Sequence, residues 1–168
     1  IPVHIFGQCA NMEEILKIAK DHNLYVVEDN AQAIGAHYTF ADGSVKKSGT
    51  MGTIGTTSFF PSKNLGCYGD GGAIFTNDDA LAHRLRGIVN HGMYERYYHD
   101  EVGVKSRLDS VQPAVLRKKL PNLDGYNDSR RKAADYYDEA FQGHEAILTP
   151  ERSVNSTHVF HQYTLRIL

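Results

Sequence analysis

Two short strand-like runs, separated by a glycine-rich loop, constrain this chain more than any other stretch. The first run, Thr56 to Phe60, carries hydroxyl and aromatic side chains, and the second, Gly72 to Thr76, is largely apolar. A Pro-Ser turn follows the first run and leads to Lys63, after which three glycines fall before the second run. Short runs bounded by proline and glycine are typical of strands. The stretch therefore predicts two strands and, between them, a turn that presents a lysine.

The surroundings of Lys63 indicate a reactive amine. Phe59, Phe60 and Leu65 flank it, and partly dry surroundings favour a neutral amine that can attack a carbonyl carbon. Ser58 and the backbone N–H groups of the loop are suited to surround an anion such as a phosphate ester. On local pattern alone, a structural hairpin whose lysine extends its ammonium into water remains an equal alternative.

A second stretch ends in two carboxylates. Leu24 to Asp29 is a short apolar run that stops at Glu28 and Asp29. In open α/β sheets, ligands gather beyond the carboxyl ends of buried parallel strands. A carboxylate at such an edge can keep a heteroaromatic nitrogen protonated. Together with a lysine that binds an aldehyde, this is the contribution that proteins make to pyridoxal phosphate chemistry.

Three phrases of the sequence resemble a known family. They are V-V-E-D-N-A-Q-A-I-G-A, S-F-F-P-S-K-N-L-G-C-Y-G-D-G-G-A-I-F-T-N-D and S-R-L-D-S-V-Q-P-A-V-L. In order and spacing they closely resemble the DegT/DnrJ/EryC1/StrS family of pyridoxal-phosphate-dependent sugar aminotransferases. The resemblance implies an α/β fold-type I large domain with a mainly parallel sheet flanked by helices. Residues 1–120 would be part of that domain, and residues 121–168 a connecting helix and the beginning of a small C-terminal domain.

The resemblance also implies an activity. Such an enzyme moves an amino group, with glutamate as the expected donor, to a keto sugar attached to a nucleotide. The amino sugars serve cell-surface polysaccharide, including lipopolysaccharide, or antibiotics, and the enzyme is expected to be a cytoplasmic homodimer. Family members are considerably longer at both ends, so the chain is expected to be a fragment.

Four matching positions acquire roles from the resemblance. Lys63 would join the cofactor aldehyde and move the proton between substrate and cofactor carbons. Asp29 would pair with the pyridine nitrogen, Gln32 would hydrogen-bond the phenolic oxygen, and Ser58 would bind the phosphate. Taken singly, Asp29 is more simply interpreted as a capping residue and Ser58 as an ordinary strand residue. The family spacing of all four favours the site.

Two positions depart from the family pattern. Lys105 stands where the family phrase G-x-N-x-R-L has an asparagine that reaches the cofactor phosphate of the neighbouring subunit. Pro113 replaces a usual alanine. Neither change touches the lysine chemistry, but Lys105 alters the expected contact between subunits.

Three other functions stay open at this point. A sugar dehydratase of the same family would carry histidine in place of Lys63. A non-catalytic regulatory protein on the same fold would not need the cofactor set. An unrelated nucleotide-binding domain could use G-D-G-G as a phosphate loop, but no helix is expected to start directly after those glycines.

Composition gives weaker limits. The net charge of -2 gives no indication of nucleic-acid binding. Two cysteines are too few for a disulfide framework. No apolar run approaches the length of a transmembrane helix. His4, Cys9, His22 and His37 lack metal-ligand spacing, so no metal site is expected.

Periodicity and capping residues predict the remaining elements. Asn11 and Glu14 suggest a capping box for the first helix, and Asn77 a cap for the second. Strands are expected at 1–6, 24–28 and 158–168, a hairpin or loop at 37–50, a loop at 93–100, a connector at 144–155, and helices at 11–22, 78–89, 110–120 and 126–141.

Overall fold

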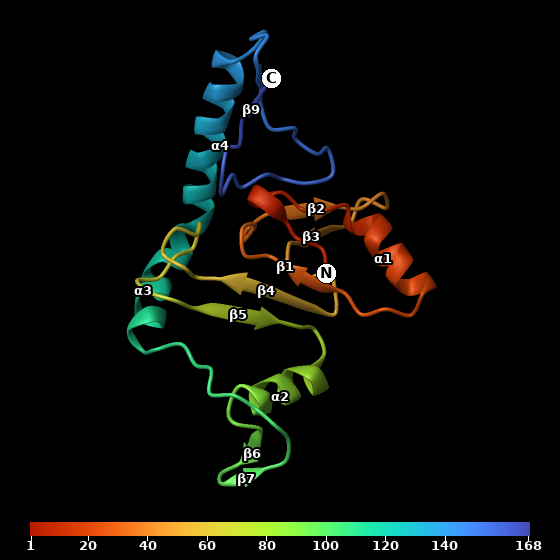
Figure 1. The fold of residues 1–168 in the computed structure, drawn as a ribbon, viewed down its shortest axis with the longest axis vertical. Coiled ribbons are helices and arrows are strands. Elements are labelled where there is room, and N and C mark those ends of the chain that lie inside the picture. Colours follow the sequence, from red (N-terminus) through yellow and green to blue (C-terminus); the bar gives the residue numbers. More distant parts are fainter.

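A three-stranded sheet forms the centre of the computed structural model, which describes all 168 residues (Figure 1). The strand order is β1 (Val27–Asp29), β4 (Ile54–Ser58) and β5 (Gly72–Phe75). β1 and β4 run parallel, whereas β4 and β5 run antiparallel. The α/β class is confirmed, and the sheet formed by these residues is mixed, with one parallel and one antiparallel strand pairing, where the sequence predicts a mainly parallel sheet.

The N-terminal residues add a short parallel edge to β1. His4 N donates to Asp29 O over 3.0 Å, and Asp29 N donates to Pro2 O over 2.9 Å. The predicted strand 1–6 is reduced to an isolated bridge at Val3, since residues 5–7 form a 3-10 turn in which Phe6 has a φ of 59°. The predicted order of strand, helix and parallel strand is nevertheless confirmed.

The first helix, α1 (Met12–Asp21), lies within one residue of its predicted bounds at each end. The capping box is wrong, because the Asn11 side chain caps no backbone group. Asn11 Oδ1 instead accepts a hydrogen bond from Tyr38 Oη over 2.8 Å. A tertiary contact has thus replaced the local one.

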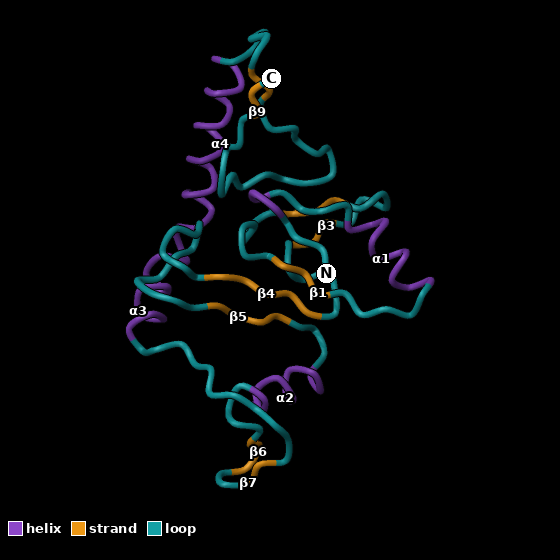
Figure 2. The backbone as a smooth tube through the Cα atoms, in the orientation of Figure 1, coloured by secondary structure: helices purple, strands orange, loops and turns teal.

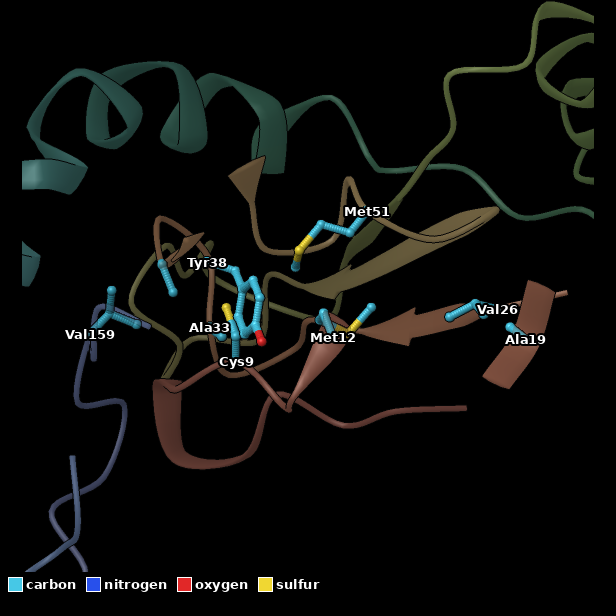
Figure 3. Close-up of a cluster of buried hydrophobic side chains, with 9 residues drawn as sticks. Cys9, Met12, Ala19, Val26, Ala33, Tyr38, Met51 and Val159 are labelled. Carbon is cyan, nitrogen blue, oxygen red and sulfur yellow. The ribbon is translucent and has the colours of Figure 1, made fainter. Parts of the chain in front are cut away.

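The hairpin expected within 37–50 is present as β2 (His37–Thr39) and β3 (Val45–Lys47). It covers the main apolar core, in which Tyr38 lies among side chains from α1, from Val26 directly before β1 and from the C-terminal segment (Figure 3). The buried members of this cluster are Cys9, Met12, Ala19, Val26, Ala33, Ala36, Tyr38, Met51 and Val159.

After the sheet, the chain forms a helix and a small hairpin. α2 (Asp79–Ile88) is capped by the Asp78 side chain, which accepts from Leu81 N, and not by Asn77. The segment predicted as a loop contains the paired strands β6 (Met93–Glu95) and β7 (Tyr98–His99). Both strands are mostly exposed, so no buried face imposes an alternating pattern on the sequence.

Two helices then run nearly without interruption. α3 (Val111–Lys119) leads through a 3-10 turn at residues 120–122 into α4 (Leu123–Ala140), which rises along one side of the molecule (Figure 1). α4 begins three residues before its predicted start. Pro121 lies near the start of the 3-10 turn, where its missing N–H costs little.

The C-terminal residues are mostly irregular (Figure 2). β8 (Ile147–Leu148) and β9 (Arg166–Ile167) form a two-residue ladder within the predicted connector and the predicted last strand. The predicted strand 158–168 is therefore largely wrong, and Phe160, with a φ of 42°, interrupts any extended run. None of the helices has the length and apolar character needed to cross a bilayer.

Candidate active site

β1 and β4 present Asp29 and Ser58 on one face of the sheet. Asp29 lies directly beside Thr56, and Ser58 follows Thr56 by two residues, so the three side chains share a face. This face is only half-buried, whereas Glu28 and Thr57 point to the opposite, buried side. The alternation leaves Asp29 and Ser58 available to a ligand.

The loop after β4 holds Lys63 in a fixed turn. Lys63 N donates to Phe60 O over 2.9 Å, and Cys67 N donates to Phe59 O over 2.8 Å. Leu65 and Cys67 are buried in a second apolar cluster with Leu116 and Leu123 of α3 and α4. Lys63 itself is half-buried, and its Nζ takes part in no hydrogen bond or ion pair within the chain.

Gln32 lies in the turn that follows β1. Its Oε1 accepts from Phe6 N over 2.6 Å, which leaves the two Nε2 hydrogens free to donate. Asp29 Oδ1 accepts from Ala31 N over 3.0 Å, and Ser58 Oγ accepts from Phe60 N over 3.2 Å. In each of these three residues, one local hydrogen bond orients the side chain. A further polar group of the same side chain has no partner within the chain.

The unused groups match the needs of pyridoxal phosphate. They comprise a free amine at Lys63, a second carboxylate oxygen at Asp29 and hydrogen-bond donors at Gln32 and Ser58. Three buried polar atoms also have no partner within the chain, and two of them, Asn30 Oδ1 and Asn64 Oδ1, belong to the residues that follow Asp29 and Lys63. The residues present therefore fit this cofactor.

The structure does not bring Lys105 into contact with these residues. Lys105 is exposed, its backbone pairs with Asn90 after α2, and its Nζ lies 3.5 Å from Asn90 Oδ1. Lys105 could therefore contact only a cofactor that is not held by the site residues of its own chain.

Sequence reasoning missed the polar cluster on the far side of β1. Glu28 and His4 are fully buried, with His4 Nε2 2.8 Å from Glu28 Oε2. The carboxylate also accepts from Gly49 N over 2.8 Å, from Met51 N over 2.6 Å and from Gly52 N. Burial alone would raise the pKa of Glu28, but the hydrogen bonds from His4, Gly52 and Gly49 hold this pKa below its ordinary value. The sequence places Glu28 and Asp29 next to each other at the end of a strand. It gave no indication that the two carboxylates lie on opposite faces of the sheet.

His161 is a second missed residue. Its Nδ1 is the third buried atom without a partner, and Arg130 Nη1 donates to the neighbouring Phe160 O over 3.0 Å. Burial, and then the charges of Lys63 and Arg130, lower the pKa of His161. A neutral imidazole therefore lies near the lysine. No pattern in the irregular segment that carries it could have predicted this.

His158 makes stability depend on pH. Its Nδ1 accepts from Phe160 N over 3.0 Å, and burial followed by the charge of Arg152 lowers its pKa from 6.5 to about 4. The unfolded chain therefore binds the extra proton first. The stabilisation is complete above pH 6.5 and declines as the pH falls towards about 4, by roughly 3 kcal/mol in total.

We expect the unfolding temperature of the full-length protein to fall between pH 7 and pH 5, and to fall less in His158→Gln. Calorimetry at half-unit pH steps measures both profiles. Parallel profiles would contradict a titrating His158.

A family model for the "DegT/DnrJ/EryC1/StrS aminotransferase family" matches residues 1–168. The chain belongs to this family. The expectation drawn from the three sequence phrases is thereby confirmed.

Curated relatives of the family extend well beyond the chain. A "Pleiotropic regulatory protein" of Geobacillus stearothermophilus is 50% identical over 168 residues, which are 99% of this chain and 44% of that protein. A UDP-N-acetyl-3-dehydro-alpha-D-glucosamine 3-aminotransferase of Acidithiobacillus ferrooxidans is 47% identical, over 99% of this chain and 44% of its own length. The chain thus spans less than half the length of these relatives.

Solved structures of the family share the fold. Streptomyces venezuelae DesV, in complex with a ketimine intermediate, matches with a TM-score of 0.92 and 41% identity, over 98% of this chain and 43% of its own. Bacillus subtilis NtdA, with bound cofactor PMP, matches with a TM-score of 0.83 and 29% identity, over 99% of this chain and 37% of its own. The chain therefore shares its three-dimensional arrangement with these solved structures.

Proposed function

We propose that the chain is the cofactor-binding part of a pyridoxal-phosphate-dependent aminotransferase that acts on a keto sugar attached to a nucleotide. The observation that carries the proposal is Lys63, a half-buried amine without a partner, in a turn that follows the strand on which Ser58 shares a face with Asp29. The amino donor is glutamate or a similar amino acid. The named relatives that aminate nucleotide sugars support this substrate class.

The wider organisation belongs to the same proposal. Residues 1–120 form part of a fold-type I large domain, and residues 121–168 form the connecting helix and the start of a small domain. The near-continuous run of α3 into α4 supports a connecting role. The enzyme works as a cytoplasmic homodimer and supplies amino sugars for lipopolysaccharide or antibiotics.

Pyridoxal phosphate, when bound, supplies an aldehyde that carries the amino group between the two substrates and a ring that takes up electrons. Lys63 would hold that aldehyde through Nζ, would be released as a free amine when the amino donor takes its place, and would then take and return the proton at Nζ. Asp29 keeps the ring nitrogen protonated with its free oxygen. Gln32 Nε2 donates to the phenolic oxygen, and the Ser58 hydroxyl donates to the phosphate.

A direct assay tests the proposed function. The full-length protein that contains this chain is incubated with pyridoxal phosphate, glutamate and a panel of UDP-, dTDP- and GDP-linked keto sugars. Mass spectrometry should find an amino sugar nucleotide, and 2-oxoglutarate should form in equal amount. A protein that binds the cofactor but aminates none of the panel would contradict the substrate class.

A non-catalytic regulator is the second candidate, favoured by the name of the relative that is 50% identical. Such a protein has no need for a reactive lysine, so it would be colourless after incubation with pyridoxal phosphate and removal of the free cofactor by gel filtration. A yellow protein whose absorbance disappears on addition of glutamate would reject this alternative. A dehydratase is disfavoured because lysine occupies position 63.

Lys105 should strengthen cofactor binding across the dimer. We propose that its segment reaches the cofactor phosphate of the neighbouring subunit, where its charge gives a contact of roughly 1.5–3 kcal/mol. Lys105→Ala in the full-length protein should then raise the dissociation constant of the cofactor about tenfold or more. Retention should also become more dependent on protein concentration and on salt.

Lys105→Asn is the matched variant, because it restores the residue of the family phrase. It should recover most of the lost affinity. Equilibrium dialysis at several protein concentrations measures all three proteins. Equal retention by Lys105→Ala and wild type at every concentration would mean that Lys105 is only a solvated side chain.

A further inference from the structure

A buried carboxamide on α4, Asn127, contacts the back of the turn that carries Lys63. Asn127 Oδ1 accepts a hydrogen bond of 2.7 Å from Asn64 Nδ2, and Asn64 directly follows Lys63. Asn127 is 1% exposed and Asn64 is 7% exposed. Water cannot replace a partner lost from this pair, so removal of either side chain leaves a polar group unsatisfied. In Figures 1 and 2 the loop that leaves β4 lies against the beginning of α4.

The same carboxamide also holds the turn that carries Gln32. Asn127 Nδ2 donates to Ile34 O over 3.2 Å, two residues after Gln32. The contact is close, because a Cβ at Gly35 would lie 2.5 Å from Asn127 Nδ2. One side chain therefore joins the lysine turn to the glutamine turn, although the two turns are separated by about thirty residues of sequence.

Asn64 extends this connection to the C-terminal segment. Its Nδ2 donates a second hydrogen bond, of 2.9 Å, to Val159 O. On α4, one turn after Asn127, Arg130 Nη1 donates to Phe160 O. The residues that precede His161 are thus held by Asn64 of the lysine turn and by Arg130 of α4.

Helix formation and stability alone do not account for an asparagine at this position. Asparagine is a mediocre helix former, and a buried amide is unfavourable unless it is hydrogen-bonded. Asn64 Oδ1 has no partner within the chain, so the pair is not optimised for its own stability. What the pair supplies is a fixed spacing between two turns.

We propose that Asn127 is a positioning residue that acts through Asn64 to hold Lys63 in register with Gln32. The proposal rests on the proposed aminotransferase function. Without Asn127, Asn64 loses its acceptor and the lysine turn can shift, while the surfaces that bind substrate remain. Small displacements of a reacting group lower turnover more than they lower binding. The turnover number should therefore fall while KM changes little.

The kinetic test uses Asn127→Ala, Asn64→Ala and the double variant in the full-length protein. Each single variant should lower kcat about tenfold. The double variant should be no slower than the slower single variant, because both substitutions remove the same contact. Losses that multiply in the double variant would contradict an action of Asn127 through Asn64.

Tyr38→Phe provides a matched control. It removes the Tyr38 hydroxyl, which donates to Asn11 Oδ1 over 2.8 Å and accepts from Glu13 N over 3.5 Å at the start of α1, and neither contact involves a residue of the lysine turn. Its unfolding temperature should fall as in Asn127→Ala, but its kcat should stay at the wild-type value. An equal loss of kcat in Tyr38→Phe and Asn127→Ala would mean that a general loss of stability, and not the position of Lys63, lowers turnover.

Chemical labelling gives a readout that needs neither cofactor nor activity. The cofactor-free protein is treated with limiting acetic anhydride, and peptide mass spectrometry compares acetylation of Lys63 with that of exposed Lys17. The ratio should change severalfold in Asn127→Ala and in the double variant, and not in Tyr38→Phe. If kcat and this ratio both stay at wild-type values, Asn127 is purely structural. A wild-type protein without transferase activity contradicts the proposed function, while the labelling still tests the positioning.

Discussion

Lys63→Ala is expected to abolish amino transfer while leaving the fold intact. In the proposed mechanism the amine of Lys63 binds the aldehyde and moves the proton, so its loss should lower kcat by about a thousandfold or more. The side chain is half-buried and Nζ contacts no partner, hence the unfolding temperature should hardly change. Assay of amino sugar formation and calorimetry measure the two effects.

Peptide mapping can identify the reactive lysine directly. Borohydride fixes a cofactor that is joined to a lysine, and the modified peptide should contain Lys63. Lys47→Ala, at an exposed lysine of β3, is the matched control and should keep full activity. Modification at Lys46 or Lys47 would contradict the assignment of Lys63.

Asp29→Asn is expected to retain the cofactor and lose most of the activity. The amide keeps the shape of the side chain and can still accept from Ala31 N, so the turn after β1 should persist. It carries no charge, however, and cannot keep the ring nitrogen protonated. A fall in kcat of about a hundredfold is expected, comparable with the loss of one preorganised electrostatic contact.

Absorbance and kinetics separate the two consequences of Asp29→Asn. Cofactor content should be near that of wild type, and the pH dependence of the cofactor absorbance should change. Unchanged turnover would mean that Asp29 only orients its own turn. Asp42→Asn, at the exposed tip of the β2–β3 hairpin, is a control that also removes one carboxylate and should have no effect on turnover.

Sequence alone predicted the elements whose signals are local. α1 and α2 have helical periodicity, and the β2–β3 hairpin has an A-D-G-S turn. The side chains of Asp29 and Ser58 could be assigned to the site from family motifs, and pairing of β1 with β4 explains why they share a face. These predictions needed no knowledge of distant contacts.

The features that sequence reasoning missed depend on distant contacts. The antiparallel return of β5 depends on how the loop after β4 packs against α3 and α4. Asn11 caps no helix because Tyr38, 27 positions away, donates to it instead. Asn127 was assigned only to a helix, since its partners at Asn64 and Ile34 lie 63 and 93 positions away. No window of sequence contains both members of such a pair.

The buried carboxylate of Glu28 has a consequence for how related chains can vary in length. Three backbone N–H groups between Gly49 and Gly52 point to this one side chain, so an inserted residue there would leave at least one of them without an acceptor. A Cβ at Gly43, by contrast, would meet no atom within 4 Å. Of these two loops, the hairpin tip is therefore the one that can accept an epitope tag or a fluorescent label without disturbing β1 and Asp29.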